Sequence, residues 1–351
     1  MNLKTIPFKS ILLVLLIMVS ITPILMAQQQ NLTRARASQH AIVMQTIGFT
    51  KMKIDYHGPL VKGRTIWGKL VPYDNVWRGG ANENTIIYFG DDVTVNGKTL
   101  SKGKYGLHLI PSKTEWTIIF SKTYWSWGSY SYDQKEDALR IKVIPESVPF
   151  QEWLSYSFDN PTSNSVVASM RWEKLKVSFK IEIDQHKLAL ENFRKQLRSV
   201  PRFFWQGWNQ AANYSLVNKI NLKEAMQWAE RSIGINKNFT NLSTKAGLLQ
   251  LMGKNKEAKT MKKNALKIAN EAQLNVAGYQ LMNVNKVDEA IELFKLNVKR
   301  HPKSWNVYDS LAEALLKKGD NKGSKENYEK ALSMVKDDAN KKRITKTLKS
   351  F

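Results

Sequence analysis

The chain has 351 residues, 42% of them hydrophobic and 24% charged, and this composition predicts a globular protein of two or three domains. It contains no cysteine, which excludes disulfides, thiolate metal sites, cysteine nucleophiles and a lipid-modified N-terminal cysteine. The net charge is +24: residues 28–183 hold 20 Lys and Arg against 14 Asp and Glu, and residues 184–351 hold 32 against 16. A basic surface attracts anionic partners. However, no basic motif interleaved with aromatic residues appears, so nucleic acid is not an expected partner.

The N-terminal segment has the layout of a signal peptide. Lys4 and Lys9 form a short basic region, Ile11–Val19 is an unbroken apolar run, and small Ala27 suits the position before a cleavage site. The apolar run is shorter than the roughly 20 residues that span a bilayer, which disfavours the alternative of an uncleaved anchor. We therefore expect residues 1–27 to be removed and the protein to be periplasmic or secreted. Only this segment, before cleavage, is expected to contact the membrane.

Residues 28–38 are polar and predicted to be flexible, and residues 39–183 carry the period of two that is typical of half-buried antiparallel strands. Asn96-Gly97 predicts a hairpin, because these residues supply the positive φ angles of a tight turn. No helical pattern interrupts this region. The sequence therefore predicts an all-β antiparallel sandwich or jelly roll of roughly nine or ten strands.

The period becomes helical near Asp184, and the rest of the chain predicts an all-α stack of helix pairs. A linking helix is expected first, and Pro201 ends or redirects it. A polar capping helix is expected last, as a stack of this kind requires. The expected ranges are 184–205 for the linking helix, 206–338 for four helix pairs and 339–351 for the capping helix.

The last two pairs align over 34 residues, so that Phe294 corresponds to Tyr328. This spacing of small and bulky apolar residues resembles tetratricopeptide repeats over about residues 206–338. The resemblance implies that the first helices of the pairs bind an extended peptide on an inner face. The surrounding Lys residues favour an acidic protein partner. The alternative is that the repeats only brace the β domain or a dimer. The residues expected on the inner face are Tyr214, Asn275, Tyr279, Met282 and Asn283.

The β region has its own dense group of unusual residues, which begins near Asp55 and continues to Gly128. Over about residues 37–160 these segments resemble a family of exported bacterial domains known as domain of unknown function 2911. The resemblance implies a location and an architecture that includes helical repeats after the domain, but it implies no activity. The segments that carry it include Lys62-Gly63-Arg64, Trp77-Arg78, Gly80-Ala81-Asn82-Glu83 and Gly103–His108.

Loops on a rigid β scaffold are where a binding site is expected. Trp offers a flat face for sugar rings or peptide side chains, and Arg can pair with a carboxylate or phosphate. The alternative is structural, with Trp67 and Trp77 in the core and Arg78 paired with Glu83 inside the fold. The candidate ligand-binding residues are Arg64, Trp67, Trp77, Arg78, Asn82, Glu83, His108 and Trp127.

No catalytic pattern accompanies these residues. Glu83 with Asp55 or Asp74 offers two carboxylates for glycoside hydrolysis, but nothing in the sequence fixes their separation. A serine nucleophile would need a Gly-x-Ser-x-Gly elbow, which the sequence lacks. The sequence thus leans away from an enzyme, and we expect no catalytic residue and no cofactor.

Metal binding is not expected either, because His40, His57, His108 and Glu83 lack the spacing of a recognised ligand set. The predicted function is an exported envelope protein that binds or scaffolds. The β domain would hold a small or polymeric ligand such as a carbohydrate, and the repeats would hold a protein or peptide. The alternative is a hydrolase that acts on envelope polysaccharide or peptide through the Arg78 and Glu83 region.

Overall fold

The structure, a computed structural model, describes residues 35–351. The predicted signal peptide at 1–27 and most of the segment 28–38 lie outside the described residues. The chain divides into two compact units, a β unit that ends at His186 and a helical unit that begins at Lys187. Among residues 35–351, no helix is both long enough and apolar enough to cross a bilayer.

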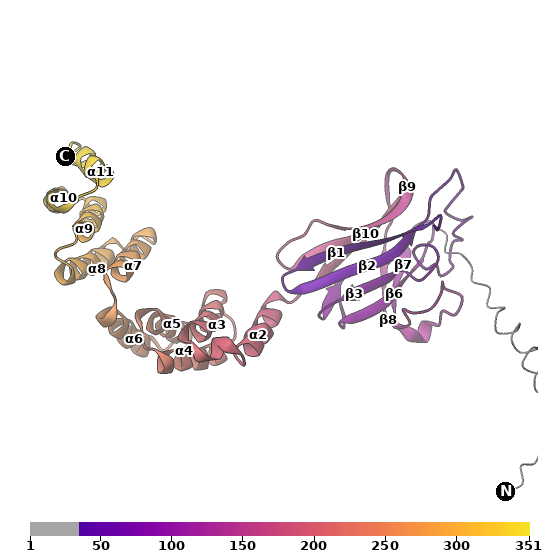
Figure 1. Ribbon diagram of the computed structural model, residues 1–351, viewed down its shortest axis with the longest axis horizontal. Helices are drawn as coiled ribbons and strands as arrows, with labels where there is room; N and C mark the ends of the chain where they lie inside the picture. Colours follow the sequence, from indigo (N-terminus) through magenta and orange to yellow (C-terminus); the bar gives the residue numbers. More distant parts are fainter. Residues whose placement is uncertain (1–34) are drawn as a thin grey trace, which may run out of the picture. The chain divides into compact units, whose positions relative to one another are not determined.

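Ten strands make up the described part of the β unit, and they form two antiparallel sheets (Figure 1). One sheet has the strand order β1-β2-β3-β6-β7-β8 and the other has the order β5-β4-β10-β9. A short 3-10 helix, η1 (Gln134–Glu136), precedes β8. The strands are β1 (Gln39–Ile47), β2 (Thr50–Gly58), β3 (Ile86–Phe89), β4 (Val93–Val95), β5 (Lys98–Leu100), β6 (Gly103–Ile110), β7 (Trp116–Ser121), β8 (Asp137–Val143), β9 (Glu146–Asp159) and β10 (Ser165–Glu182).

The two sheets bury their apolar faces against each other. In β2, Met52 points inward and is fully buried, whereas its neighbour Lys53 faces outward. Phe120 of β7 meets Phe179 of β10 edge to face, with the ring centroids 5.6 Å apart. The hairpin between β4 and β5 turns at Asn96-Gly97, with φ angles of 45° and 80°. The predicted antiparallel sandwich is therefore confirmed, because the period of two separates an inner apolar face from an outer polar face.

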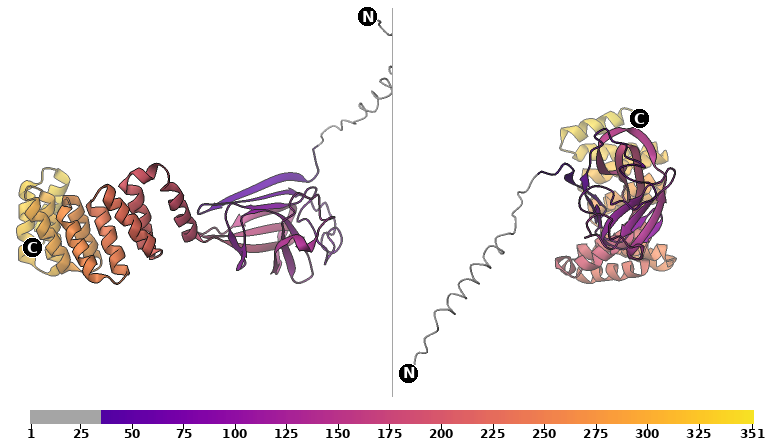
Figure 2. Two further views of the ribbon diagram at one scale, coloured as in Figure 1. Left: turned by 90° about the horizontal axis from the view of Figure 1, so that it is seen from below. Right: turned by 90° about the vertical axis from the view of Figure 1, so that its right-hand side faces the viewer.

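The helical unit contains the predicted linking helix, helix pairs and capping helix. Figure 2 shows successive pairs stacked side by side. A 3-10 turn, η2 (Val200–Phe203), contains Pro201 and separates α2 from α3. The helices are α2 (Gln185–Gln196), α3 (Trp205–Asn218), α4 (Leu222–Ile235), α5 (Phe239–Leu251), α6 (Asn255–Ile268), α7 (Glu271–Asn283), α8 (Val287–Arg300), α9 (Trp305–Lys318), α10 (Asn321–Met334) and α11 (Asp338–Leu348).

Small residues let the two helices of a pair approach closely. Gly278 of α7 faces Phe294 of α8, and a Cβ atom at position 278 would lie 2.4 Å from Cε1 of that ring. In the next pair Ala312 and Tyr328 occupy the corresponding positions, and both are buried in one apolar cluster. The 34-residue register of the sequence is thus the register in which large side chains of second helices pack on small residues of first helices.

We expect Gly278→Ala to destabilise the helical unit by about 1–3 kcal/mol, because the new methyl group overlaps a buried aromatic ring. The matched control is Gly234→Ala in α4, where nothing lies within 4 Å of the added Cβ. The control should raise stability by up to about 1 kcal/mol, since Ala favours the helix over Gly. Urea unfolding followed by circular dichroism measures both. Equal effects of the two substitutions would contradict the packing described for Gly278.

A second expectation concerns the independence of the β unit. A fragment of residues 28–185 contains every strand and the whole of the two-sheet core. It should therefore melt cooperatively with a β-type circular dichroism spectrum, as a domain with its own core does. An unfolded fragment, together with a stable full-length chain, would show that the boundary or the independence of the unit is wrong.

Candidate functional site

Two long connections of the β unit meet at one edge of the six-stranded sheet. The connection between β2 and β3 leads into Ile86, and the connection between β7 and β8 starts after Ser121 and leads into Asp137. In the sheet Ile86 pairs with Gly106, Gly106 with Ser121, and Ser121 with Asp137. These residues are therefore neighbours in one row across four strands, and the two connections begin or end beside each other.

The β2–β3 connection pairs with β6 at two separate points. The backbone of Trp77 exchanges two hydrogen bonds with Leu109, each of 2.8 Å, and Leu107 N donates to Thr85 O at 2.8 Å. His108 lies between these two points. Residues 79–84 leave the sheet and are held by Gly79 O, which accepts from Tyr156 Oη at 2.7 Å and from Thr85 Oγ1 at 3.2 Å.

This double pairing fixes which side chains surround His108. Trp77 and Thr85 point to the inner face, because their partners in β6 are inward residues. Side chains alternate between the two faces of a strand. Arg78 and Asn84 are next to these inward positions, so the alternation assigns them to the outer face with His108, and the contact of Arg78 with Trp127 agrees with this for Arg78.

His108 is buried on the outer face, with 3% of its surface exposed, although it lies outside the apolar core. Its Nδ1 lies 2.9 Å from the hydroxyl of Ser129 in the β7–β8 connection. Its ring lies 5.5 Å from that of Tyr132. Burial lowers the pKa of His108 to about 4, so the imidazole is neutral at pH 7.

Tyr132 holds the β7–β8 connection to the sheet. Its hydroxyl donates to Asp137 Oδ2 at 2.7 Å, and Asp137 also forms an ion pair of 2.9 Å with Arg140. Burial, together with the bond to Asp137, raises the pKa of Tyr132 to about 12. The connection is therefore anchored over His108 by a neutral hydroxyl and a paired carboxylate.

Two polar groups on either side of His108 have no partner within the described part of the chain. Asn84 is 4% exposed, and neither its amide oxygen nor its amide nitrogen forms a hydrogen bond. Arg78 Nε is buried and likewise unpaired. An unsatisfied buried polar group destabilises a fold by roughly 1–3 kcal/mol, so such groups need an explanation.

The β7–β8 connection also carries exposed aromatic rings. Trp125 is 71% exposed, Trp127 is 60% exposed and Tyr130 is 81% exposed. The rings of Trp127 and Tyr130 stack at 5.7 Å with an interplanar angle of 10°. The guanidinium carbon of Arg78 lies 5.5 Å from the centroid of Trp127. An exposed aromatic surface thus adjoins the unpaired group of Arg78.

Gly128 allows this approach. Its φ is +69°, and a Cβ atom there would lie 2.5 Å from Arg78 Nη1. A side chain at this position would therefore displace the guanidinium as well as strain the backbone. The loop sequence Trp-Gly-Ser, at 127–129, places an aromatic ring, a residue without a side chain and a hydroxyl in succession around Arg78 and His108.

Arg78, His108 and Trp127 are the predicted ligand-site residues that come together here. Trp67 and Trp77 instead belong to an aromatic cluster of the interior. The ring of Trp67 meets that of Trp116 at 4.8 Å, and the ring of Trp77 stacks on that of Trp172 at 5.9 Å. Both rings are partly buried and pack against the fully buried rings of Trp116 and Trp172, so they are closer to the structural alternative than to an open ligand site.

The three remaining predicted residues also have partners within the fold. Arg64 donates to the backbone carbonyls of residues 60 and 61, at 2.5 Å and 3.0 Å. Asn82, with φ of +59°, donates to the carbonyl of Ser38 at 3.3 Å. Glu83 pairs with Arg36 at 2.6 Å and lies 3.4 Å from His57. The internal pair of Arg78 with Glu83 is therefore not formed.

Glu83 belongs to a separate group of titratable residues at the start of β1 and the end of β2. Besides its contact with Glu83, His57 has its ring 5.0 Å from that of His40, and His40 Nε2 lies 2.6 Å from Asp55. Hydrogen bonds from Arg36 lower the pKa of Glu83. No group of three or more possible metal ligands occurs in residues 35–351.

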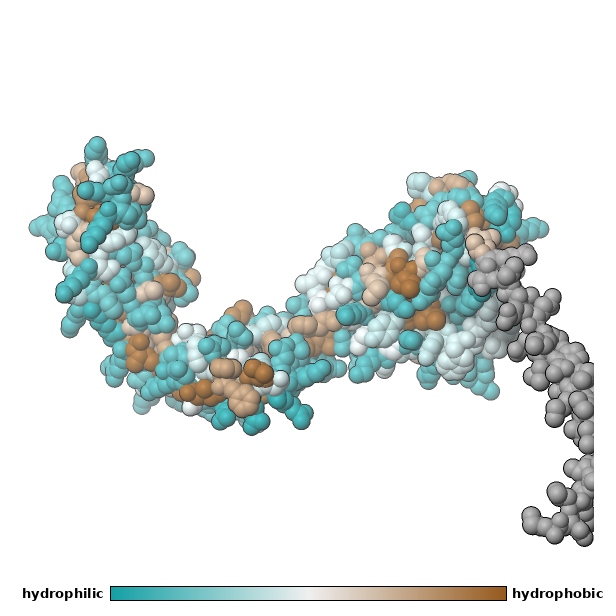
Figure 3. Space-filling model, in the orientation of Figure 1, coloured by the Kyte–Doolittle hydropathy of each residue, from teal (hydrophilic) through white to brown (hydrophobic). Residues whose placement is uncertain are grey.

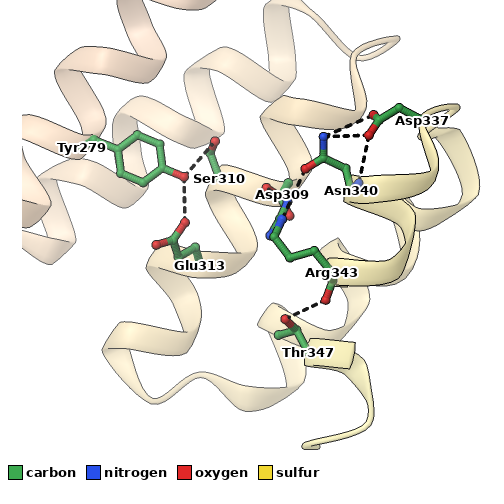
Figure 4. A network of polar contacts seen from close by, with 8 residues as sticks. All are labelled: Tyr279, Asp309, Ser310, Glu313, Asp337, Asn340, Arg343 and Thr347. Carbon is green, nitrogen blue, oxygen red and sulfur yellow. Dashed lines mark hydrogen bonds and ion pairs between the residues drawn. The ribbon is translucent and has the colours of Figure 1, made fainter. Parts of the chain in front are cut away.

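The helical unit contains a second candidate surface on its first helices (Figure 4). Tyr279 of α7 donates to Glu313 of α9 at 2.7 Å and approaches Ser310 at 3.4 Å. One turn before Glu313, Asp309 accepts a hydrogen bond of 2.7 Å from Arg343 of α11. A row of polar contacts therefore joins three helices that are not consecutive in the chain, and we call it the inner strip.

The five residues expected on the inner face take different positions. Met282 differs from the expectation, because it is 5% exposed and packs in the core between α7, α8 and α9. The ring of Tyr279 packs edge to face on Phe294 at 5.3 Å, so only part of it is accessible. Tyr214 meets Phe193 of the linking helix in the same manner at 5.1 Å. Asn275 is partly exposed with an unpaired Oδ1, and Asn283 is exposed.

The Lys excess of the helical unit lies away from the first helices. Helices α3, α5, α7 and α9 carry three basic and three acidic residues. Helices α4, α6, α8 and α10 carry thirteen basic and eight acidic residues, and α11 carries four and one. The inner strip is therefore not a basic surface, which the total charge did not reveal.

A further apolar patch lies at the beginning of the helical stack. Val200 is 66% exposed, Phe203 is 72% exposed and Phe204 is 56% exposed. Figure 3 shows apolar side chains gathered over α4 and the turn before α3. Exposed aromatic residues in such a patch are typical of contact surfaces.

Sequence reasoning missed Asn84, Ser129 and Tyr130 in the β unit and Arg343 in the helical unit. The run from Trp125 to Tyr130 contains three aromatic residues among Ser and Gly, which is a usable signal for an exposed binding loop. Asn84 carries no such signal. Its burial depends on pairing between the β2–β3 connection and β6, which local sequence does not disclose.

Comparison with known proteins finds a family model that matches the β unit. Residues 38–181 match the family described as "Protein of unknown function (DUF2911)". This agrees with the expected resemblance and extends it through most of β10. The comparison with curated proteins found no match.

Solved structures match part of the chain. YrrB, described as a TPR protein with an unusual peptide-binding site, is 18% identical, with 47% of this chain and 84% of that chain covered and a TM-score of 0.29. MamA from Desulfovibrio magneticus RS-1 is 16% identical, with 41% of this chain and 81% of that chain covered and a TM-score of 0.27. PilF of Pseudomonas aeruginosa is 20% identical, with 37% and 60% covered and a TM-score of 0.26.

We expect the stability of the β unit to fall as the pH is lowered from about 6.5 towards 4. Folded His108 has a pKa of about 4, whereas in the unfolded chain it titrates near about 6.5. In this window the unfolded state binds one proton more than the folded state, so acid favours unfolding. Over the whole window, protonation of His108 on unfolding lowers the free energy of unfolding by about 3 kcal/mol.

Urea unfolding at pH 7 and pH 5 tests this contribution. The variant His108→Gln should lose less stability between the two pH values than the unmodified chain does. Identical differences in the two proteins would exclude His108 as the source.

Proposed function

We propose that this chain is an exported, non-enzymatic binding or scaffolding protein whose helical unit holds a protein partner along its first helices. The observation that carries the proposal is the inner strip, which runs from Tyr279 through Glu313 and Asp309 to Arg343. It brings polar side chains of three helices together, and the exposed carboxylate of Glu313 can accept further hydrogen bonds beside the one from Tyr279. Stacked helix pairs present such extended surfaces to partners.

The chemistry of the inner strip suits the backbone of an extended peptide. Asn275 and Asn283 each lie about one turn from Tyr279 on α7, on either side of it. An amide side chain can both donate to and accept from a peptide group. Asn275 is partly exposed, but its unpaired Oδ1 is itself buried, so a peptide would reach the amide first at its nitrogen. Part of the Tyr279 ring adds an apolar contact beside these amides.

The charge of the partner follows from where the charged residues lie. Glu313 is exposed on α9, and Arg343 is already bound to Asp309. A segment that is neutral or carries a basic residue next to Glu313 therefore suits the inner strip better than an acidic one. An acidic partner, as the total charge suggests, would instead meet the second helices and α11.

For the β unit we propose a ligand site at the β7–β8 connection, with a carbohydrate as its ligand. Trp127 and Tyr130 supply the stacking surface that sugar rings use. The alternative of a hydrolase through Arg78 and Glu83 has less support. The bonds from Arg36 keep Glu83 ionised, so it is a poor proton donor near neutral pH.

Export remains part of this proposal. It is supported by the basic and apolar layout of residues 1–27. A periplasmic or secreted location also fits a cysteine-free chain that relies on packing for its stability.

Site-specific photo-crosslinking in the native host tests partner docking. A photoreactive residue at position 283, on α7, should give a discrete crosslinked protein. The same residue at position 263, on the Lys-rich α6, should not. The reverse pattern would mean that the partner uses the second helices.

Affinity for the captured protein then measures the inner strip directly. Asn275→Ala should weaken binding by roughly 1–2 kcal/mol, in the range of an interface residue. Asn327→Ala on α10, whose amide donates to Gly323 O, is the matched control and should leave binding unchanged. Loss of binding in the control alone would refute docking on the inner strip.

A further inference from the structure

The outer face of the β unit leaves hydrogen-bonding groups unused next to His108. Asn84 is almost fully buried with both ends of its amide unpaired, and the buried Arg78 Nε, on the other side of His108 in the double pairing with β6, is also unpaired. Both groups are fixed by backbone pairing, and neither belongs to the apolar core. Buried groups without internal partners can be satisfied by a ligand or by ordered water.

We infer that Arg78, Asn84 and Ser129 form a binding site for the oxyanion of an acidic ring-shaped ligand, with Trp127 and Tyr130 stacking on its ring. The chemical class is a sugar that bears a carboxylate or a phosphate. This inference rests on the proposal that the β unit binds a carbohydrate, and it adds the acidic group and the residues that recognise it.

The charge balance of the site favours an anion. No acidic side chain among the described residues forms an ion pair with Arg78. Two carboxylates of the same connections have other partners, since Glu83 is bound by Arg36 and Asp137 by Arg140. The guanidinium therefore carries an uncompensated positive charge in a partly buried place. Its planar fork matches both carboxylate and phosphate.

The neighbouring groups include donors for such an anion. The amide nitrogen of Asn84 has two hydrogens, and its amide oxygen would have to face away from the anion. The single hydrogen of the Ser129 hydroxyl is free for the ligand in the tautomer in which His108 Nδ1–H donates to Ser129 Oγ, 2.9 Å away. Because His108 stays neutral at pH 7, Arg78 is the positive charge that the site offers to the acidic group of the ligand.

The ring of the ligand has its own surface. Arg78 and Tyr130 both contact the ring of Trp127, yet Trp127 remains 60% exposed and Tyr130 81% exposed. A sugar ring stacked on Tyr130 or against the edge of Trp127 would place its acidic substituent near the guanidinium. Gly128 keeps the path between ring and guanidinium free of a side chain.

Isothermal titration calorimetry on the full-length chain, with glucuronate, glucose 6-phosphate and glucose as probes, tests the inference. We expect glucuronate, glucose 6-phosphate or both to bind at least about tenfold more tightly than glucose, as a charge-assisted pair requires. The stronger of the two acidic probes identifies the carboxylate or the phosphate as the preferred group. Binding of glucose as strong as that of both acidic probes, or no binding of any probe, would overturn the inference.

Two variants assign the site to the named residues. Arg78→Gln should weaken the preferred acidic probe at least about tenfold, and Arg78→Lys should weaken it less, because Lys keeps the charge but loses the fork. Arg171→Gln removes one exposed positive charge from β10 of the same unit. It is the control and should change binding less than about twofold, as distant exposed charges are screened.

Asn84→Leu gives a readout that a structural role would not produce. Leu has a similar size and no unpaired amide, so we expect an unchanged or higher melting temperature together with loss of acidic-probe binding. A lower melting temperature with unchanged binding would show that Asn84 acts in the fold and not in the site. If Asn84→Leu does not fold, the comparison of Arg78→Gln with Arg171→Gln decides whether the acidic probe binds at this site.

The outcomes separate this inference from the broader proposal. Loss of all sugar binding on replacing Trp127 by Ala, with no effect of Arg78→Gln, would support a carbohydrate site and reject its acidic specificity. Equal loss with both variants supports the complete site. Unchanged binding in both would reject the ligand site at this connection altogether.

Discussion

The β unit depends on one arrangement of the backbone, the double pairing of β6 with the β2–β3 connection. The chain leaves the sheet after Arg78, forms a loop of six residues and returns to β6 at Thr85. Tyr156 of the opposite sheet fixes this loop through Gly79 O. The positions of Arg78, Asn84 and His108 therefore follow from main-chain hydrogen bonds and not from contacts between their own side chains. Such a rigid base is what a binding site needs for its polar groups to stay unpaired in the free state.

The sequence predicts the two architectures because each has a strong period. Alternation in β2 and the 34-residue register of Gly278 and Phe294 reflect forces that act between neighbours in one element or one pair. The site is harder to predict because it depends on contacts between distant segments, which these local forces do not determine. Trp77 and Trp127 look alike in sequence, yet one lies between the sheets and the other outside them. Which of the two is buried depends on pairing with distant strands, and so does the isolation of Asn84.

Net charge gives a second example of this limit. The excess of Lys in the helical half is real, but the structure places most of it on second helices and α11. Second helices are amphipathic, with a buried apolar stripe against the first helices and a polar outer face. Their Lys residues keep the outer face solvated. The first helices are buried on more sides, so they carry few charges, and those of the inner strip, such as Asp309 and Glu313, already have bonds within the fold.

The bond between Asp309 and Arg343 has a consequence for the length of the stack. Asp309 is 6% exposed, and burial raises the pKa of its carboxyl against the opposing effect of Arg343. The cation of α11 thus neutralises a charge that would be strongly unfavourable if left alone. An additional helix pair inserted between α10 and α11 would separate the two residues, whereas a pair inserted between α6 and α7 would not. The capping helix therefore ends the stack by neutralising a buried charge of the last repeat. Repeats can be gained or lost in the middle of such a stack more readily than next to the capping helix.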